Sequence, residues 1–122
     1  MPALSNIIKS KAITEWSVGL ASRELVRKDH RIIDVYTNQL HKSNFDVITQ
    51  KGKVVVFSKI FSIIREKPNT KKRIIQSQIE NIKKEMFNYG LNKTYKCRFD
   101  IITVVYDSGL PKIEFEKEII SL

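Results

Sequence analysis

Residues 45–61, FDVITQKGKVVVFSKIF, contain two β-strand patterns in immediate succession. Two runs rich in β-branched and aromatic residues, Phe45 to Gln50 and Lys53 to Phe61, are separated only by Lys51-Gly52. Because glycine readily adopts the positive φ of a tight turn, this spacing predicts an antiparallel hairpin. A third β-rich run, Arg31 to Thr37, comes before the pair. The sequence therefore predicts a three-stranded antiparallel meander.

Helical patterns lie on both sides of this meander. On the N-terminal side, Thr14 can cap a helix that runs from Glu15 to about Lys28. Its expected buried stripe is Val18, Ala21, Ser22 and Leu25. On the C-terminal side, Pro68-Asn69-Thr70 supplies a stop and a new cap for a helix over about 70–89, which Gly90 ends. Its apolar positions are Ile75, Ile79, Ile82 and Met86.

Two further strands complete the pattern. The β-rich run from Arg98 to Tyr106 is followed by the turn Asp107-Ser108-Gly109 and then by Lys112 to Ile120. The last segment alternates Ile113, Phe115 and Lys117 with Glu114, Glu116 and Glu118, which is typical of a half-exposed strand. The expected order is α-β-β-β-α-β-β, in the α/β class with a mixed sheet.

Length and composition restrict the class of protein. The 122 residues fit one domain, which we assign to residues 14–122, with residues 1–13 as an N-terminal extension. A hydrophobic content of 42% with 4 Gly and 3 Pro excludes disordered and collagen-like chains. The single cysteine, Cys97, cannot form an intramolecular disulfide, and no Cys/His cluster exists to hold zinc. Without a membrane-spanning run or a signal peptide, we expect a cytoplasmic protein with no membrane contact.

The charge is strongly positive and unevenly distributed. The formal net charge is +9, and residues 61–98 hold ten basic and three acidic side chains, against two and five after position 98. This excess favours an anionic partner, nucleic acid and especially DNA, bound through phosphates without sequence preference on one side of the molecule. The candidate phosphate-contacting residues are Lys67, Lys71, Lys72, Arg73, Lys83 and Lys84. A solvated basic helix face with no ligand is the alternative.

Four stretches in order carry a family resemblance. They are Leu20 to Ile33, Phe45 to Phe57, the helix start Lys71-Lys72-Arg73, and Arg98 to Ile102. Together they resemble the bacterial YraN family of predicted endonucleases, in the Holliday-junction-resolvase branch of the PD-(D/E)XK nucleases, over about residues 14–120. The resemblance implies a restriction-endonuclease-like core and metal-assisted phosphodiester hydrolysis. In such a site an Asp on strand two and a Glu on strand three hold Mg²⁺, and a Lys two residues later orients the nucleophile.

The sequence departs from this motif at the metal site. Asp46 matches the strand-two Asp, but the family's Glu falls on Lys59 and its Lys on Phe61. Shifting the alignment by two residues makes Lys59 the Lys but leaves Phe57 in place of the Glu; the family's helix-one Glu falls near Val18. A lysine about 4 Å from a divalent cation costs about 8 kcal/mol at an effective dielectric constant near 20. We therefore expect no metal or other cofactor, and a Lys59–Asp46 ion pair in its place.

Three functions stay open at this point. The favoured one is a nucleic-acid-binding protein with a nuclease-like fold that has lost most of its metal ligands. In the second, an active metal-dependent endonuclease uses Asp46 and an acid that has moved to the first helix, Glu15 or Glu24, with Mg²⁺ or Mn²⁺. In the third, the terminal strand from Glu114 to Ile120 serves as an edge for a homodimer or scaffold.

Several other residues have a structural and a functional interpretation. Asp100 either bonds nearby backbone amides or takes part in catalysis, and Trp16 and Tyr36 either stack bases or belong to the core and its rim. We expect His30 and His41 at the surface and Cys97 to be unreactive.

Overall fold

The computed structural model describes residues 11–36, 43–64, 76–106 and 109–122. Its elements are α1 (Lys11–Arg27), β1 (Arg31–Val35), β2 (Val47–Lys51), β3 (Val54–Ile64), α2 (Gln76–Tyr89), the short 3-10 helix η1 (Leu91–Lys93), β4 (Lys96–Tyr106) and β5 (Lys112–Ser121). The strands form one mixed sheet in the order β1-β2-β3-β4-β5, so β1 and β5 are its edges. The mixed α/β class that the sequence predicts is confirmed.

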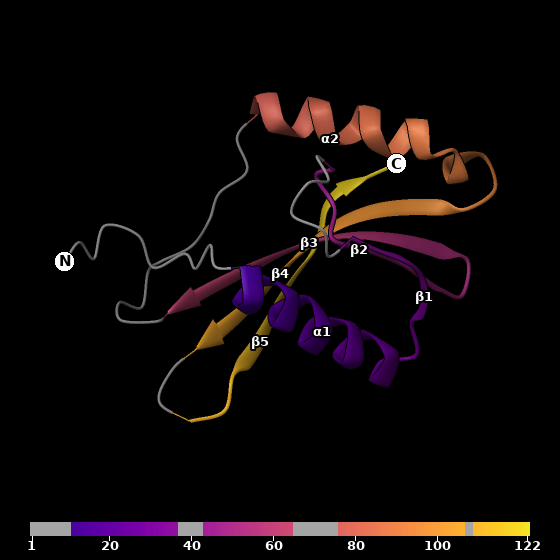
Figure 1. Ribbon diagram of the computed structural model, residues 1–122. Coiled ribbons are helices and arrows are strands. Elements are labelled where there is room, and N and C mark those ends of the chain that lie inside the picture. The colour runs from indigo at the N-terminus through magenta and orange to yellow at the C-terminus, as the bar shows by residue number, and fades with distance from the viewer. Residues whose placement is uncertain (1–10, 37–42, 65–75, 107–108) are drawn as a thin grey trace.

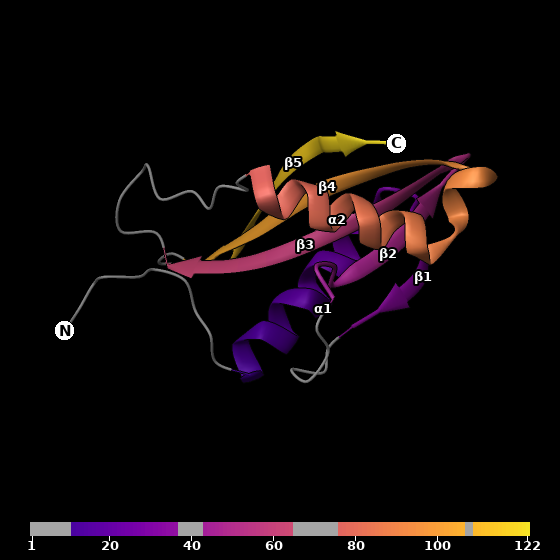
Figure 2. The same cartoon turned by 90° about the horizontal axis from the view of Figure 1, so that it is seen from above.

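Helices α1 and α2 lie on opposite faces of the sheet (Figures 1 and 2). The first three strands pair antiparallel, and β2 and β3 are joined at Gly52, whose φ of 61° is the value that the Lys51-Gly52 spacing requires. The chain then crosses from β3 to β4, which run parallel from Val54↔Lys96 to Ile64↔Tyr106, and the connection carries α2. This crossover places β3 and β4 at the centre of the sheet.

Each helix covers its own hydrophobic cluster. Val18, Ala21 and Leu25 of α1 are buried, as predicted, against one face of the sheet, and Ser22 is half-buried. Ile82 and Met86 of α2 are buried against the other face, where the rings of Phe45 and Phe57 lie 4.8 Å apart between their centroids. Since strand side chains alternate between faces, even-numbered residues of β3 face α1 and odd-numbered residues face α2.

The boundaries of several elements differ from the sequence prediction. Helix α1 begins at Lys11, before the predicted Thr14 cap, and β3 continues to Ile64, beyond the predicted end at Phe61. Helix α2 is described only from Gln76, and the predicted start near Thr70, together with Ile75, lies outside the described residues. Strand β3 is longer than expected because its pairing with β4 continues after β2 has ended.

Strand β5 also departs from the predicted alternation. Ile113 and Phe115 share one side, as the alternation predicts, and pack on the α1 face, but Glu118 has a positive φ of 55° and the register with β4 shifts near it. A bulge of this kind turns the following residues to the opposite face. Ile120 is consequently buried in the cluster beneath α2.

Candidate functional site

Asp46 and Lys59 form the ion pair that the sequence predicts. Asp46 directly precedes β2, and Lys59 lies in β3 on the face covered by α2. The Lys59 Nζ lies 3.4 Å from the Asp46 Oδ2, and the two side chains are 31% and 6% exposed. The prediction of a contact between them is confirmed. Lys59 thus holds its ammonium against the one acid that matches the metal-binding motif.

The backbone fixes the Asp46 carboxylate at the point where β2 leaves β3. The last paired residues are Val47 and Ser58, and the Asp46 N–H donates to the Ser58 carbonyl oxygen at 2.8 Å. Two residues further along β3, the Ile60 N–H donates to the Asp46 Oδ2 at 2.7 Å. This carboxylate oxygen accepts from a buried backbone amide and also pairs with Lys59.

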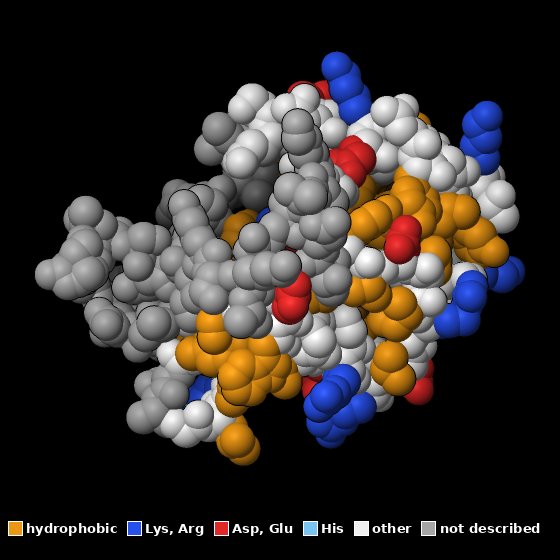
Figure 3. Space-filling view, in the orientation of Figure 1, with side chains coloured by type: hydrophobic (Ala, Val, Ile, Leu, Met, Phe, Trp, Pro, Cys, Tyr) orange, Lys and Arg blue, Asp and Glu red, His pale blue; other side chains and the backbone are white. Residues whose placement is uncertain are grey.

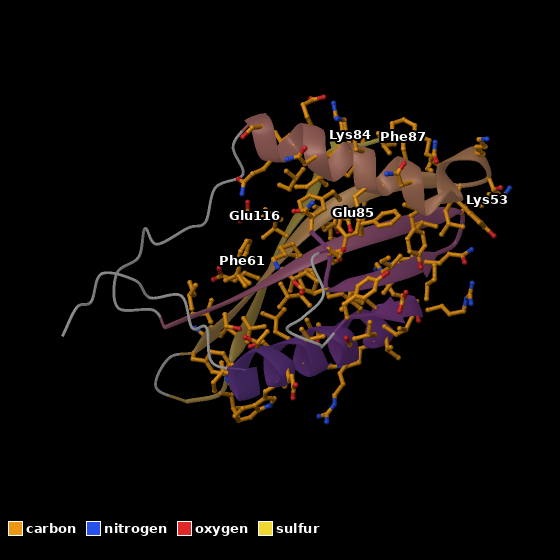
Figure 4. The ribbon with its side chains drawn as sticks, turned by 45° about the horizontal axis from the view of Figure 1, so that its top comes forward. Lys53, Phe61, Lys84, Glu85, Phe87 and Glu116 are labelled. Carbon is orange, nitrogen blue, oxygen red and sulfur yellow. The ribbon has the colours of Figure 1, made fainter. Side chains whose placement is uncertain are left out.

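Glu85 of α2 ties the segment before Asp46 to the helix. Its Oε1 accepts hydrogen bonds from the backbone and side-chain nitrogens of Asn44, at 2.8 and 2.9 Å, and its Oε2 accepts one from the Ser43 hydroxyl. Figure 4 shows Glu85 on the side of α2 that faces the sheet. The sequence prediction missed Glu85, although an acid between the buried positions Ile82 and Met86 indicates a polar contact on that side.

Two tyrosines lie next to this segment. The Tyr36 N–H donates to the Asp46 carbonyl oxygen at 2.7 Å, and the Tyr89 hydroxyl donates to Asp34 Oδ2 at 3.4 Å. Burial, reinforced by the hydrogen bond to Asp34, raises the pKa of Tyr36 to about 12, and burial also raises the pKa of Tyr89. Both hydroxyls are therefore protonated at neutral pH and cannot serve as bases. Tyr36 packs against the core, so of its two predicted roles, base stacking and core packing, the structure supports core packing.

The residues around Asp46 do not fit a divalent metal. Among the described residues, no three His, Cys, Asp or Glu side chains come together in a way that could hold an ion. The motif's Glu and Lys positions carry Lys59 and Phe61, and the Lys59 ammonium lies 5.9 Å from the Phe61 ring centroid. The acids of α1 lie on a helix that covers the opposite face, where Glu24 pairs with Arg27 at 3.3 Å. Mg²⁺ usually binds through one or two carboxylates with water in its remaining positions, and here the Lys59 ammonium already lies at the carboxylate that matches the motif.

The predicted phosphate-contacting residues are only partly described. Lys67, Lys71, Lys72 and Arg73 lie outside the described residues. On α2, Lys83 pairs with Glu80 at 3.9 Å, and Lys84 is exposed on the outer side of the helix beside Phe87 (Figure 4). Figure 3 shows the described Lys and Arg side chains distributed around the rim of one face, with apolar side chains between them. Lys83 and Lys84 are thus accessible to a polyanion.

Asp100 has a structural role, as one of its two interpretations predicted. Its Oδ1 accepts a hydrogen bond from the Glu118 N–H at 3.0 Å, and its Oδ2 accepts one from Arg98 Nη2 at 3.2 Å. Burial raises the pKa of Asp100, and these two partners oppose that effect. Asp100 therefore holds the bulge of β5. Cys97, also in β4, is buried, and burial raises its pKa, which agrees with an unreactive thiol.

The expectation that His30 lies at the surface is wrong. His30 is only 8% exposed, and its Nδ1 lies 2.8 Å from the Thr49 hydroxyl oxygen. Sequence reasoning placed it in a loop, but the end of α1 folds back so closely that the His30 N–H bonds the Leu25 carbonyl oxygen at 2.9 Å. His41 lies outside the described residues. Trp16, in contrast, is 57% exposed, at the rim of the α1 layer beside Tyr106.

Comparisons with known proteins add no family assignment. No protein-family model matches the chain, and no curated protein is similar to it. Among the described residues, no helix is long and apolar enough to cross a membrane. The YraN resemblance therefore stays a prediction from sequence.

We expect the Asp46–Lys59 pair to be coupled in folding stability. In a double-mutant cycle with Asp46→Ala and Lys59→Ala, urea denaturation should give a coupling free energy of about 0.5–3 kcal/mol. Asp46→Ala should be the more costly single change, by about 1–3 kcal/mol, because it also leaves the buried Ile60 N–H without its acceptor. Additive single effects would show that the contact contributes nothing. Glu24→Ala with Arg27→Ala, an exposed pair, is the control and should give a smaller coupling.

We also expect the fold to lose stability as the pH falls from about 6.5 to about 4. Burial, together with the positive charges of nearby lysines and an arginine, lowers the pKa of His30 from 6.5 to about 4. The unfolded chain therefore binds more protons in this window, and the free energy of unfolding decreases by up to about 3 kcal/mol. Urea denaturation of His30→Gln should lack this part of the pH dependence, and His41→Gln should retain it. Identical pH profiles for the wild type and His30→Gln would contradict the assignment.

Proposed function

We propose that the protein binds nucleic acid, DNA in particular, with a restriction-endonuclease-like core whose metal site is closed. The observation that carries the proposal is the Lys59–Asp46 ion pair, at 3.4 Å, in the place where the resemblance expects a carboxylate and a metal ion. Its ammonium occupies the region that a divalent cation would need and repels that cation. Binding without cleavage is the function that this arrangement supports best.

The fold and the charge support the other parts of the proposal. A helix, a three-stranded meander, a crossover helix and a fourth strand follow one another in one mixed sheet, which supports this part of the proposal. The formal charge of +9 favours phosphate contacts, which contribute affinity without reading sequence. The exposed Lys84 and the partly exposed Lys83 of α2 are the described members of the expected contact set.

The proposal predicts binding that weakens steeply with salt. Fluorescence anisotropy with four-way-junction, duplex and single-stranded DNA should give a linear fall of log affinity with log salt concentration, with a slope of about 0.9 per neutralised phosphate on duplex DNA. Arg73→Gln, Lys83→Gln and Lys84→Gln together should weaken binding at least about tenfold and reduce the duplex slope by up to about 3. No cleavage of any substrate should occur in Mg²⁺ or Mn²⁺.

A charge-matched triple variant is the control. Arg23→Gln, Lys93→Gln and Lys112→Gln remove the same charge from exposed positions on α1, η1 and β5. The control should lose less affinity than the Arg73, Lys83 and Lys84 variant; an equal loss would show only a general charge effect and remove these three residues from the interface. Cleavage that Asp46→Ala abolishes would overturn the proposal and establish the enzyme instead.

A further inference from the structure

A pocket lies on the opposite face of the sheet from Lys59. It is a pocket of about 280 Å³ at the end of the sheet that contains the β2–β3 turn. Helix α1, strands β2, β4 and β5 and the α1–β1 turn all contribute to it. Its lining residues are Leu25, Lys28, His30, Lys51, Arg98, Asp100, Phe115 and Lys117. The size is close to the lower end of small-molecule pockets, about 300 Å³, which suits a compact ligand.

The charges in this pocket are unbalanced. Four cationic side chains line it, from four different elements: Lys28, Lys51, Arg98 and Lys117. The one acid among the lining residues, Asp100, is already engaged by Arg98 and by the Glu118 N–H. Three lysines therefore remain in excess over the acid in the pocket, and Lys28 is held with its Nζ 5.0 Å from the centroid of the Phe115 ring.

Arg98 is the arginine among these four cations, and its guanidinium lies beside Asp100. Its Nε lies 3.1 Å from Asp100 Oδ1, so the two groups attract each other. The Nε–H is nevertheless not directed at that oxygen, and this buried donor has no hydrogen-bond partner among the described residues. The Arg98 side chain is 20% exposed and lines the pocket, so its guanidinium charge acts on an anion bound there.

The lowered pKa of His30 indicates that the pocket has a positive electrostatic potential. After burial, the causes that lower its pKa are the charges of Lys51, Arg98, Lys117 and Lys28, the same four cations that line the pocket. Asp100 is the only acid among the residues that line the pocket together with His30. At neutral pH the ring is uncharged, and its Nδ1 lies 2.8 Å from the Thr49 hydroxyl. The imidazole of His30 is therefore an uncharged group near four cationic side chains.

We infer that this pocket binds a phosphate group, held by the ammonium groups of Lys28, Lys51 and Lys117 and by the guanidinium of Arg98. Phosphate oxygens accept from both lysine and arginine donors, and arginine offers them a planar pair. The group can belong to a small free phosphate compound or to the 5′-terminal phosphate of a nucleic acid. Since a free compound needs no nucleic acid, the inference does not depend on the proposed function.

The test uses inorganic pyrophosphate as the probe, in about 0.15 M salt, where charges more than about 8 Å apart are largely screened. Calorimetric titration of the full chain should detect saturable binding, and NMR should show the pKa of His30 rising by about one unit when the site is filled, because the anion offsets the surrounding cations. Lys51→Gln with Lys117→Gln should weaken binding at least about tenfold.

Lys53→Gln with Lys112→Gln is the matched control. Both lysines are exposed and near the altered ones in sequence, neither lines the pocket, and Figure 4 shows Lys53 at the outer end of the β2–β3 hairpin. The control should bind pyrophosphate within about twofold of the wild type. No binding of pyrophosphate, no change at His30, or an equal loss in both double variants would overturn the inference.

A pair of oligonucleotides distinguishes the two sources of the phosphate. If the ligand is a nucleic-acid end, a 5′-phosphorylated strand should bind at least about fivefold more tightly than the same strand with a 5′-hydroxyl, and Lys51→Gln with Lys117→Gln should abolish this preference. Pyrophosphate binding without such a preference assigns the pocket to a small phosphate compound. Because Arg73, Lys83 and Lys84 are not among the residues that line this pocket, loss of DNA binding in their triple variant does not affect the pyrophosphate result.

Discussion

The carboxylate of Asp46 is the group around which the site is organised, because one of its oxygens serves two neighbours. Oδ2 accepts the buried Ile60 N–H at 2.7 Å and lies 3.4 Å from the Lys59 ammonium. The first contact is part of the fold, since it continues the β2–β3 pairing after Val47 and Ser58. The second contact determines the chemistry, since a cation already neutralises the acid that a metal would need. In the proposed function, the fold and the closed metal site are therefore linked through one oxygen atom.

Much of this arrangement could be predicted from residues 45–61. Alternation along a strand and a two-residue turn determine which side chains of β2 and β3 meet, so the Lys59–Asp46 contact follows from parity. Glu85 and His30 could not be predicted in the same way. Their partners, Asn44 and Thr49, are 41 and 19 residues away in sequence, and the contacts depend on how α2 and the end of α1 settle on the sheet. The bulge at Glu118 likewise depends on the buried carboxylate of Asp100.

The two faces of the sheet carry different chemistry. On the α2 face, Lys59, Asp46 and Glu85 use their charges on one another or on backbone and amide groups of the chain. On the α1 face, the cations around His30 outnumber the single acid that lines the pocket with them. We therefore propose two consequences of the excess of basic residues: one lysine closes the site that the family resemblance implies, and others keep a separate pocket open to an anion. The two sites can be tested separately, because Lys59 is not among the residues that line the pocket.

The closed metal site is tested most directly by anomalous diffraction from crystals soaked in Mn²⁺, with the wild type and Lys59→Glu compared at equal concentration. The substitution replaces the ammonium beside Asp46 with a second carboxylate, which supplies the oxygen ligands that Mn²⁺ prefers. We predict no anomalous peak at Asp46 in the wild type and a peak between Asp46 and the new carboxylate in Lys59→Glu. An Mn²⁺ ion bound to Asp46 in the wild-type protein, with Lys59 displaced, would contradict the account.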